Sequence, residues 1–109
     1  MNSGRPMMLL RARTRPEVRG EFDRWFDTVH MANARSIPGI ARALSGRANG
    51  GTRLAVYLFE NAEKVQPALT SPQAAYTRGT WERWQSDLEE MSLELWAEVV
   101  SMPMFEEIN

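Results

Sequence analysis

Apolar and polar positions along the chain repeat at two spacings, and the segments that repeat every second residue predict four strands. Residues 7–13 form a short apolar run that becomes alternating, which is typical of a strand. Residues 40–47 and 53–60 are extended runs on either side of the loop 48–52, whose Asn-Gly pair accepts the positive φ angles of a tight hairpin turn. Residues 93–101 alternate again and predict the fourth strand.

Between the first two strands the spacing changes to that of an amphipathic helix. Thr14 and Glu17 have capping-box spacing, Pro16 is tolerated in a first helical turn, and Pro38-Gly39 ends the helix after about Ile37. The face that we expect to be buried consists of Val18, Phe22, Trp25, Phe26, Val29, Asn33 and Ser36.

A second helical region is predicted after the hairpin. Asn61 can cap a short helix over residues 62–69, and Ser71-Pro72 has the pattern of an N-cap followed by a first-turn proline. The helical stretch that starts there should run to about Glu90, with Gly79 as a possible interruption. Its buried stripe is expected to consist of Trp81, Trp84, Leu88 and Met91.

The β-α-β-β-α-β order predicts an α+β fold, a ferredoxin-like sandwich with one four-stranded antiparallel sheet. One strand face is uniformly apolar and should carry the helices: Met8, Leu10, Ala12, Leu54, Val56, Leu58, Leu93, Leu95, Ala97 and Val99. The opposite face is mixed: Leu9, Arg11, Arg13, Ala55, Tyr57, Phe59, Glu94, Trp96, Glu98 and Val100. Its three aromatic side chains favour a second copy of the sheet packed against it, and the alternative is a monomer with a partly apolar back.

Length and composition narrow the class of protein. The 109 residues suffice for one domain, with a core over about residues 7–101, a flexible segment 1–6 and a short tail 102–109. The net charge is −1 and the basic residues are scattered, so we expect no nucleic-acid partner. The chain has no cysteine, no secretory signal and no apolar run of membrane-spanning length, which favours a cytoplasmic protein without a membrane partner.

Two segments resemble a known family. Residues 21–30, Glu-Phe-Asp-Arg-Trp-Phe-Asp-Thr-Val-His, are followed by Ile-Pro-Gly-Ile at 37–40, and Tyr-Leu-Phe-Glu at 57–60 is followed by Ser-Pro at 71–72. This pattern resembles the EthD-like branch of the dimeric α/β-barrel superfamily. The resemblance implies a two-chain barrel, with a pocket in each subunit between helices and sheet. His30 would be the polar group that enters the pocket, with Trp25 and Asp27 completing the motif.

His30 is the only histidine, and therefore the main candidate for proton transfer near neutral pH. With ~100° per residue it lies about 80° from Phe22, at the border between core and surface. Asp27, three residues earlier, could orient its ring, and the two form the candidate catalytic pair. The alternative is a histidine that caps the edge of the core beside a solvated carboxylate. One histidine without cysteine makes a metal site improbable, and no haem or flavin signature is matched, so no cofactor is expected.

The aromatic residues suggest the walls of a substrate site, although core or interface packing is their commoner role. Candidate substrate-binding residues are Trp25, Phe26, Tyr76 and Trp84. The superfamily includes cofactor-free monooxygenases, isomerases, cyclases, lyases and members without known activity. The first hypothesis is therefore a cofactor-independent enzyme for a hydrophobic, aromatic or polyketide-like substrate. The others are a non-catalytic ligand-binding or accessory protein and a purely structural homodimer.

Overall fold

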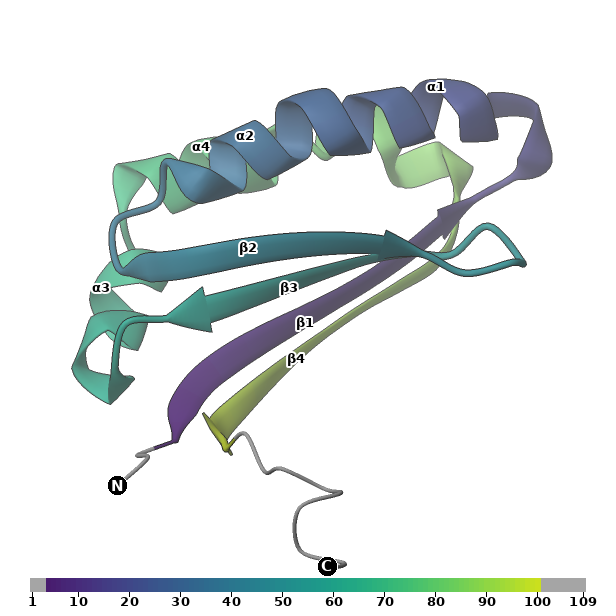
Figure 1. Cartoon of the computed structure of the whole chain (residues 1–109). Helices are drawn as coiled ribbons and strands as arrows, with labels where there is room; N and C mark the ends of the chain where they lie inside the picture. Colours follow the sequence, from purple (N-terminus) through teal and green to yellow (C-terminus); the bar gives the residue numbers. More distant parts are fainter. Residues whose placement is uncertain (1–3, 101–109) are drawn as a thin grey trace, which may run out of the picture.

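The computed structural model describes residues 4–100 and contains one antiparallel four-stranded sheet with its helices on one face (Figure 1). The strands are β1 (Arg5–Thr14), β2 (Ile40–Arg47), β3 (Arg53–Phe59) and β4 (Leu88–Val99), and their order in the sheet is β2-β3-β1-β4. The two central strands are thus the first and third in the chain. The predicted ferredoxin-like α+β fold is confirmed.

The chain ends of this fold differ slightly from the prediction. β1 begins at Arg5, so Arg5 and Pro6, which were expected to precede the core, belong to the sheet. The expected tail 102–109 and the last residue of the expected fourth strand lie outside the described residues.

The helix between β1 and β2 is built from consecutive segments. A 3₁₀ turn (Pro16–Val18) leads into α1 (Arg19–Trp25), a π-helical segment covers Phe26–His30, and α2 (Met31–Arg35) completes the helix. Pro16 stands in the first turn as expected, but the N-cap is Arg15 and no side chain caps this end. The expected capping role of Thr14 is wrong because Thr14 is the last residue of β1, where its side chain is fully buried.

The second helical region is shorter than predicted. It consists of α3 (Val65–Leu69) and α4 (Pro72–Gly79), followed by a 3₁₀ segment over Glu82–Asp87. Gly79 is the last residue of α4. Leu88 and Met91, expected on the helical stripe, lie in β4, while Trp81 and Trp84 are buried as predicted. Leu88 has an extended backbone (φ −78°, ψ 126°), so the chain enters the strand there.

Both caps predicted in this region are confirmed. The Asn61 side chain accepts a hydrogen bond from the Lys64 amide at 3.1 Å, at the start of the 3₁₀ turn Ala62–Lys64. The Ser71 hydroxyl accepts one from the Ala74 amide, also at 3.1 Å. These bonds satisfy amides that have no intrahelical acceptor.

The β2–β3 hairpin forms where the sequence predicts it. Its loop is closed by the Ala48 amide bonding to the Thr52 carbonyl at 2.9 Å. The positive φ angle falls on Gly51, at 92°, and not on Asn49 or Gly50. This position favours glycine because of its conformation, since other residues rarely adopt such a φ angle.

β3 presents the opposite face to the helices from the one that the sequence predicted. Arg53, Ala55, Tyr57 and Phe59 are buried under the helices, whereas Leu54, Val56 and Leu58 are half-buried on the outer face. The register agrees, since Met8 pairs with Tyr57 and Leu10 with Ala55. Both faces of β3 carry apolar residues. The alternation therefore shows that the segment is a strand, but not which of its two faces points toward the helices. The prediction for Met8, Leu10 and Ala12 of β1 is confirmed.

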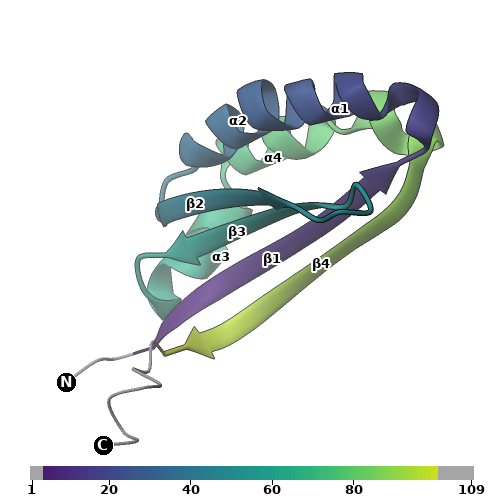
Figure 2. The same ribbon diagram turned by 45° about the vertical axis from the view of Figure 1, so that its right-hand side comes forward.

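As a consequence, the outer face of the sheet is more apolar than expected. The register places these residues together on it: Met7 and Leu9 of β1, Leu44 of β2, Leu54, Val56 and Leu58 of β3, and Trp96 of β4. We call this set the outer patch. Leu44 is 43% and Trp96 50% exposed. Figures 1 and 2 show no helix on this side.

β4 lies at the sheet edge farthest from the helix layer (Figure 2). Leu93 and Leu95 point to the helix side, because they pair with Leu10 and Met8 of β1. They are nevertheless 57% and 53% exposed, since the helices do not extend over this strand. The edge of the helix-side face is therefore an uncovered apolar strip.

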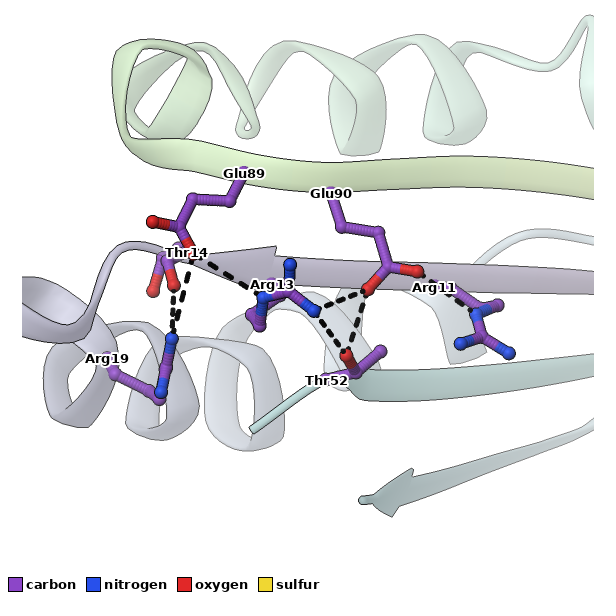
Figure 3. A network of polar contacts seen from close by, with 7 residues as sticks. All are labelled: Arg11, Arg13, Thr14, Arg19, Thr52, Glu89 and Glu90. Carbon is purple, nitrogen blue, oxygen red and sulfur yellow. Dashed lines mark hydrogen bonds and ion pairs between the residues drawn. The ribbon is translucent and has the colours of Figure 1, made fainter. Parts of the chain in front are cut away.

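A polar network closes one end of the sheet (Figure 3). Glu90 accepts hydrogen bonds from the Thr52 hydroxyl at 2.9 Å and from Arg11 and Arg13 at 3.4 Å each. The Thr52 hydrogen bond, followed by the arginine charges, lowers the pKa of Glu90. Arg19 donates to the Thr14 carbonyl at 2.8 Å. The network joins the end of β1, the start of β4, the hairpin and the start of α1, and it bounds the outer patch on this side.

Candidate functional site

The π-helical segment Phe26–His30 changes which residues of the first helix face the sheet. The Met31 amide bonds to the Phe26 carbonyl five residues earlier. Such a turn holds one residue more than an α-turn, so later residues fall about 100° behind their α-helical positions. His30, expected about 80° from Phe22, is thereby turned to within about 20° of it, and its side chain is 2% exposed.

The same shift moves the rest of the buried face by one residue. Val29, expected inside, is 39% exposed, whereas Ala34 and Ile37 are buried in place of Asn33 and Ser36. The border position predicted for His30 is therefore wrong, and the cause is the π-turn. π-turns occur frequently at functional sites.

His30 makes two hydrogen bonds inside the core. Its Nδ1 accepts the indole N–H of Trp81 at 3.1 Å, and its Nε2 lies 2.5 Å from the hydroxyl oxygen of Tyr57. An indole N–H only donates, so Nδ1 carries no proton, and in the neutral ring the proton is on Nε2. Nε2 therefore donates to the Tyr57 oxygen. Within residues 4–100 the Tyr57 hydroxyl has no second hydrogen-bond partner, so its own proton is free to be donated.

Burial favours the uncharged forms of both His30 and Tyr57. It lowers the pKa of His30 to about 4 and raises the pKa of Tyr57. At neutral pH the pair is an uncharged imidazole bonded to an uncharged phenol. Chemically it can donate a hydrogen bond to an oxygen atom, and it holds no charge that would repel an apolar ligand.

Aromatic rings surround this pair. The ring centroids of Trp25, Phe26 and Trp81 lie 5.8, 5.2 and 4.9 Å from that of His30. Trp84 packs behind them, 5.6 Å from Trp25. The structure thus brings three of the four candidate wall residues, Trp25, Phe26 and Trp84, into one cluster with His30. The fourth, Tyr76, is 67% exposed on α4 and is not among the aromatic rings that pack against His30.

Asp27, the expected orienter of His30, is bound elsewhere. Its carboxylate lies 2.5 Å from Nη2 of Arg53, and the side chain is 53% exposed. No hydrogen bond joins it to His30 within the described part of the chain. The π-turn explains the separation, because it turns His30 into the core while Asp27 stays toward solvent.

Tyr57, Trp81 and Arg53 contribute to the site but were not candidates from the sequence. Tyr57 and Arg53 lie on the face of β3 that was assigned to the outside. Trp81 belongs to the predicted buried stripe, and its spacing gave no sign of a hydrogen bond to His30. Tyr57 and Arg53 could have been found from the alternation Arg53-Ala55-Tyr57-Phe59, which places two large aromatic side chains on the same face of the strand.

Other kinds of site find little support among residues 4–100. No group of three or more His, Cys, Asp or Glu side chains is placed to hold a metal ion. None of the helices in that range is long and apolar enough to cross a membrane.

Comparison with known proteins identifies relatives by structure alone. No family model and no curated protein matches the chain. An EthD family protein from Bacillus halodurans superposes with a TM-score of 0.67 at 18% identity, over 86% of this chain and 99% of that one. SnoaB of Streptomyces nogalater, a cofactor-independent oxygenase, superposes with a TM-score of 0.67 at 14% identity, over 92% of this chain and 98% of that one.

A third match comes from Deinococcus radiodurans. This protein, provisionally assigned as an antibiotic biosynthesis monooxygenase, gives a TM-score of 0.69 at 10% identity over 90% of this chain and 96% of that one. The likeness establishes the fold. It agrees with the resemblance to EthD-like dimeric α/β-barrel proteins. Identities this low leave the reaction to be argued from the site.

Proposed function

We propose that this protein is a small-molecule enzyme without a bound cofactor, in which His30 and Tyr57 together donate a hydrogen bond to an oxygen atom of a hydrophobic substrate. The observation that carries the proposal is the 2.5 Å contact between His30 Nε2 and the Tyr57 hydroxyl oxygen in an aromatic core. A polar pair is costly to bury, so a role in chemistry accounts for its presence. The oxygenase among the structural neighbours supports the same class of activity.

The hydrogen-bond directions suggest what the pair does. His30 donates to the Tyr57 oxygen, which leaves the phenolic proton to be donated to a substrate oxygen such as a ketone or quinone carbonyl. Donation to that oxygen stabilises the negative charge that develops on it when the proton of a neighbouring C–H bond passes to a base. His30 is not that base, because Trp81 occupies Nδ1 and Nε2 carries a proton, so water or a basic group of the substrate takes the C–H proton. Lyases, isomerases, cyclases and cofactor-free monooxygenases that act on aromatic or polyketide-like compounds can all use such a step.

The substrate would approach from the uncovered strip of β4. Leu95 is the β4 partner of Met8, and Met8 is the β1 partner of Tyr57, so the three lie in one row across the sheet. Met8 is half-buried and has a flexible side chain, and Leu95 is exposed. His30 and Tyr57 are each 2% exposed, so the side chains of Met8 and Leu95 would have to move for a substrate to reach them. Trp25, Phe26 and Trp84 would form the wall.

A second copy of the chain would cover the outer patch. Its seven apolar residues form a continuous surface across all four strands, and monomeric proteins rarely leave such a surface in water. Each copy carries the same patch, so two sheets can pack face to face about a twofold axis. We therefore propose a homodimer, as the resemblance to the dimeric barrel proteins also implies.

A non-catalytic ligand-binding protein is the second candidate, and the almost complete burial of His30 favours it. A closed aromatic cluster can hold a ligand without turnover. The two candidates differ in the effect of the Tyr57 hydroxyl, because an enzyme needs it for rate whereas a binding protein needs it only for affinity.

The decisive experiment is a screen of aromatic and polyketide-like ketones and quinones, with oxygen consumption and product mass as readouts. Each active compound is then tested with Tyr57→Phe, using Tyr76→Phe as the matched control because Tyr76 is exposed. The enzyme proposal predicts turnover that falls by roughly 10²-fold or more in Tyr57→Phe and is unchanged in the control. Ligand binding without turnover in any protein would support the binding candidate instead.

A further inference from the structure

Arg53 is a charged residue in the core of the protein. It lies on the helix-facing side of β3, four residues before Tyr57, and is 3% exposed. Burying a guanidinium is costly unless its donors are paired, so its contacts identify what it holds in place.

Its contacts converge on the helix just before His30. Nη2 pairs with the Asp27 carboxylate at 2.5 Å, and Nη1 lies 3.3 Å from the Asp23 carbonyl and 3.4 Å from its carboxylate. The guanidinium carbon lies 4.6 Å from the centre of the Phe26 ring. Nε donates to the Gly46 carbonyl of β2 at 3.1 Å, which fixes the arginine to the sheet.

These contacts lie on both sides of the place where the helix changes its period. Asp23 is in α1, whereas Phe26 and Asp27 open the π-helical segment. A rigid guanidinium fork that binds both sides at once fixes the rotation of one relative to the other. In an uninterrupted α-helix, His30 would lie about 100° further round, away from Tyr57.

We propose that Arg53 is a positioning residue: by holding Asp23, Phe26 and Asp27 it maintains the π-turn that aims His30 at Tyr57. Its catalytic consequence rests on the proposed function, but the positioning itself does not. Asp27 then acts on His30 only through Arg53. The groups that face the imidazole are the Tyr57 hydroxyl from β3, the Trp81 indole after α4, and the Trp25 and Phe26 rings of its own helix, and none of them is charged.

The test uses the NMR signals of His30, which is the only histidine. Arg53→Lys keeps the positive charge and removes the fork. We expect its His30 to lose nuclear Overhauser contacts with the Tyr57 ring and the Trp81 indole, and its proton affinity to rise roughly 10-fold or more toward that of a solvated histidine. Arg47→Met is the matched control, because Arg47 binds the same Asp23 carboxylate at 3.1 Å from an exposed position. It should leave both signals as in the wild type.

Asp27→Ala gives a second test that also serves if Arg53→Lys does not fold. Removing a nearby negative charge would by itself lower the pKa of His30, whereas release of the π-turn would raise it. We therefore expect a higher pKa and weaker contacts with Tyr57. Folded variants with wild-type His30 contacts, or a lowered pKa in Asp27→Ala, would overturn the proposal. Neither readout uses a substrate, so failure here is separate from failure of the enzymatic proposal.

Discussion

Trp81 donates its indole N–H to Nδ1 of His30 at 3.1 Å, and this bond determines which ring nitrogen keeps a proton. The proton must be on Nε2, which faces Tyr57. A residue after α4 thereby sets the tautomer of a residue in the first helix, and that tautomer directs the phenolic proton of Tyr57 away from His30. The chemistry proposed for the site depends on this chain of bonds.

Tyr57→Phe should separate chemistry from packing. The ring remains, but the His30 N–H loses its buried acceptor, so the free energy of unfolding should fall by about 1–3 kcal/mol. Urea denaturation at pH 7 measures this change. Tyr76→Phe, at an exposed position, should change stability by less than about 0.5 kcal/mol, and an equal loss in both variants would contradict a buried His30–Tyr57 bond.

His30→Ala should destabilise the fold. The side chain is 2% exposed, so its removal leaves a cavity and leaves the Trp81 N–H without an acceptor. We expect a loss of about 2–4 kcal/mol in the free energy of unfolding, measured by urea denaturation at pH 7. An unchanged midpoint would contradict the burial of His30 and would fit the border position that an uninterrupted α-helix predicts.

The pH dependence of stability should carry a contribution from His30. Its pKa is about 4 in the folded state against an ordinary 6.5, so the unfolded chain takes up the proton first as pH falls. The contribution is complete above pH 6.5 and decreases by about 3 kcal/mol between pH 7 and pH 4. Carboxylates add their own dependence, so the quantity to measure is the difference between wild type and His30→Gln at each pH. A difference that stays constant across this range would contradict the lowered pKa.

Val56→Glu should disrupt the proposed homodimer. Val56 pairs with Leu44 and Leu9 at the centre of the outer patch, and a carboxylate there would be buried against its twofold copy. Light scattering at micromolar concentration should give twice the chain mass for the wild type and a single chain mass for the variant. Tyr76→Glu, on the opposite helix layer, should remain a dimer. A monomeric wild type would contradict the assignment of the outer patch.

Much of the fold could be predicted from the sequence because its signals are local. Alternation, the Asn61 and Ser71 caps and the Asn-Gly hairpin each depend on a few neighbouring residues, and each appears in the structure. The face of β3 could not be predicted in the same way. Either face of this strand is apolar enough to form part of the core: Leu54, Val56 and Leu58 on one side, or Ala55, Tyr57 and Phe59 on the other. Which face is buried depends on how the helices pack against the sheet, and this is not a local property of the sequence.

The burial of His30 could not be predicted from the sequence, because the helix changes from the α-helical to the π-helical period at residues 26–30. Asn33 and Ser36 on the expected apolar face were the available sign that the pattern had slipped, because Ala34 and Ile37 beside them are the apolar residues. The bond between Asp27 and Arg53 joins residues 26 positions apart, so no local pattern predicts it. The sequence therefore identified the histidine, but the partners that determine its chemistry required the three-dimensional arrangement.

The most direct test of the account is a titration of His30 by imidazole ¹⁵N NMR in the wild-type protein. The account predicts a neutral ring at pH 7 with its proton on Nε2, Nδ1 unprotonated, and a pKa of about 4 caused by burial. A pKa near 6.5, or a proton on Nδ1 at neutral pH, would contradict the buried His30–Tyr57 pair on which the proposed function rests.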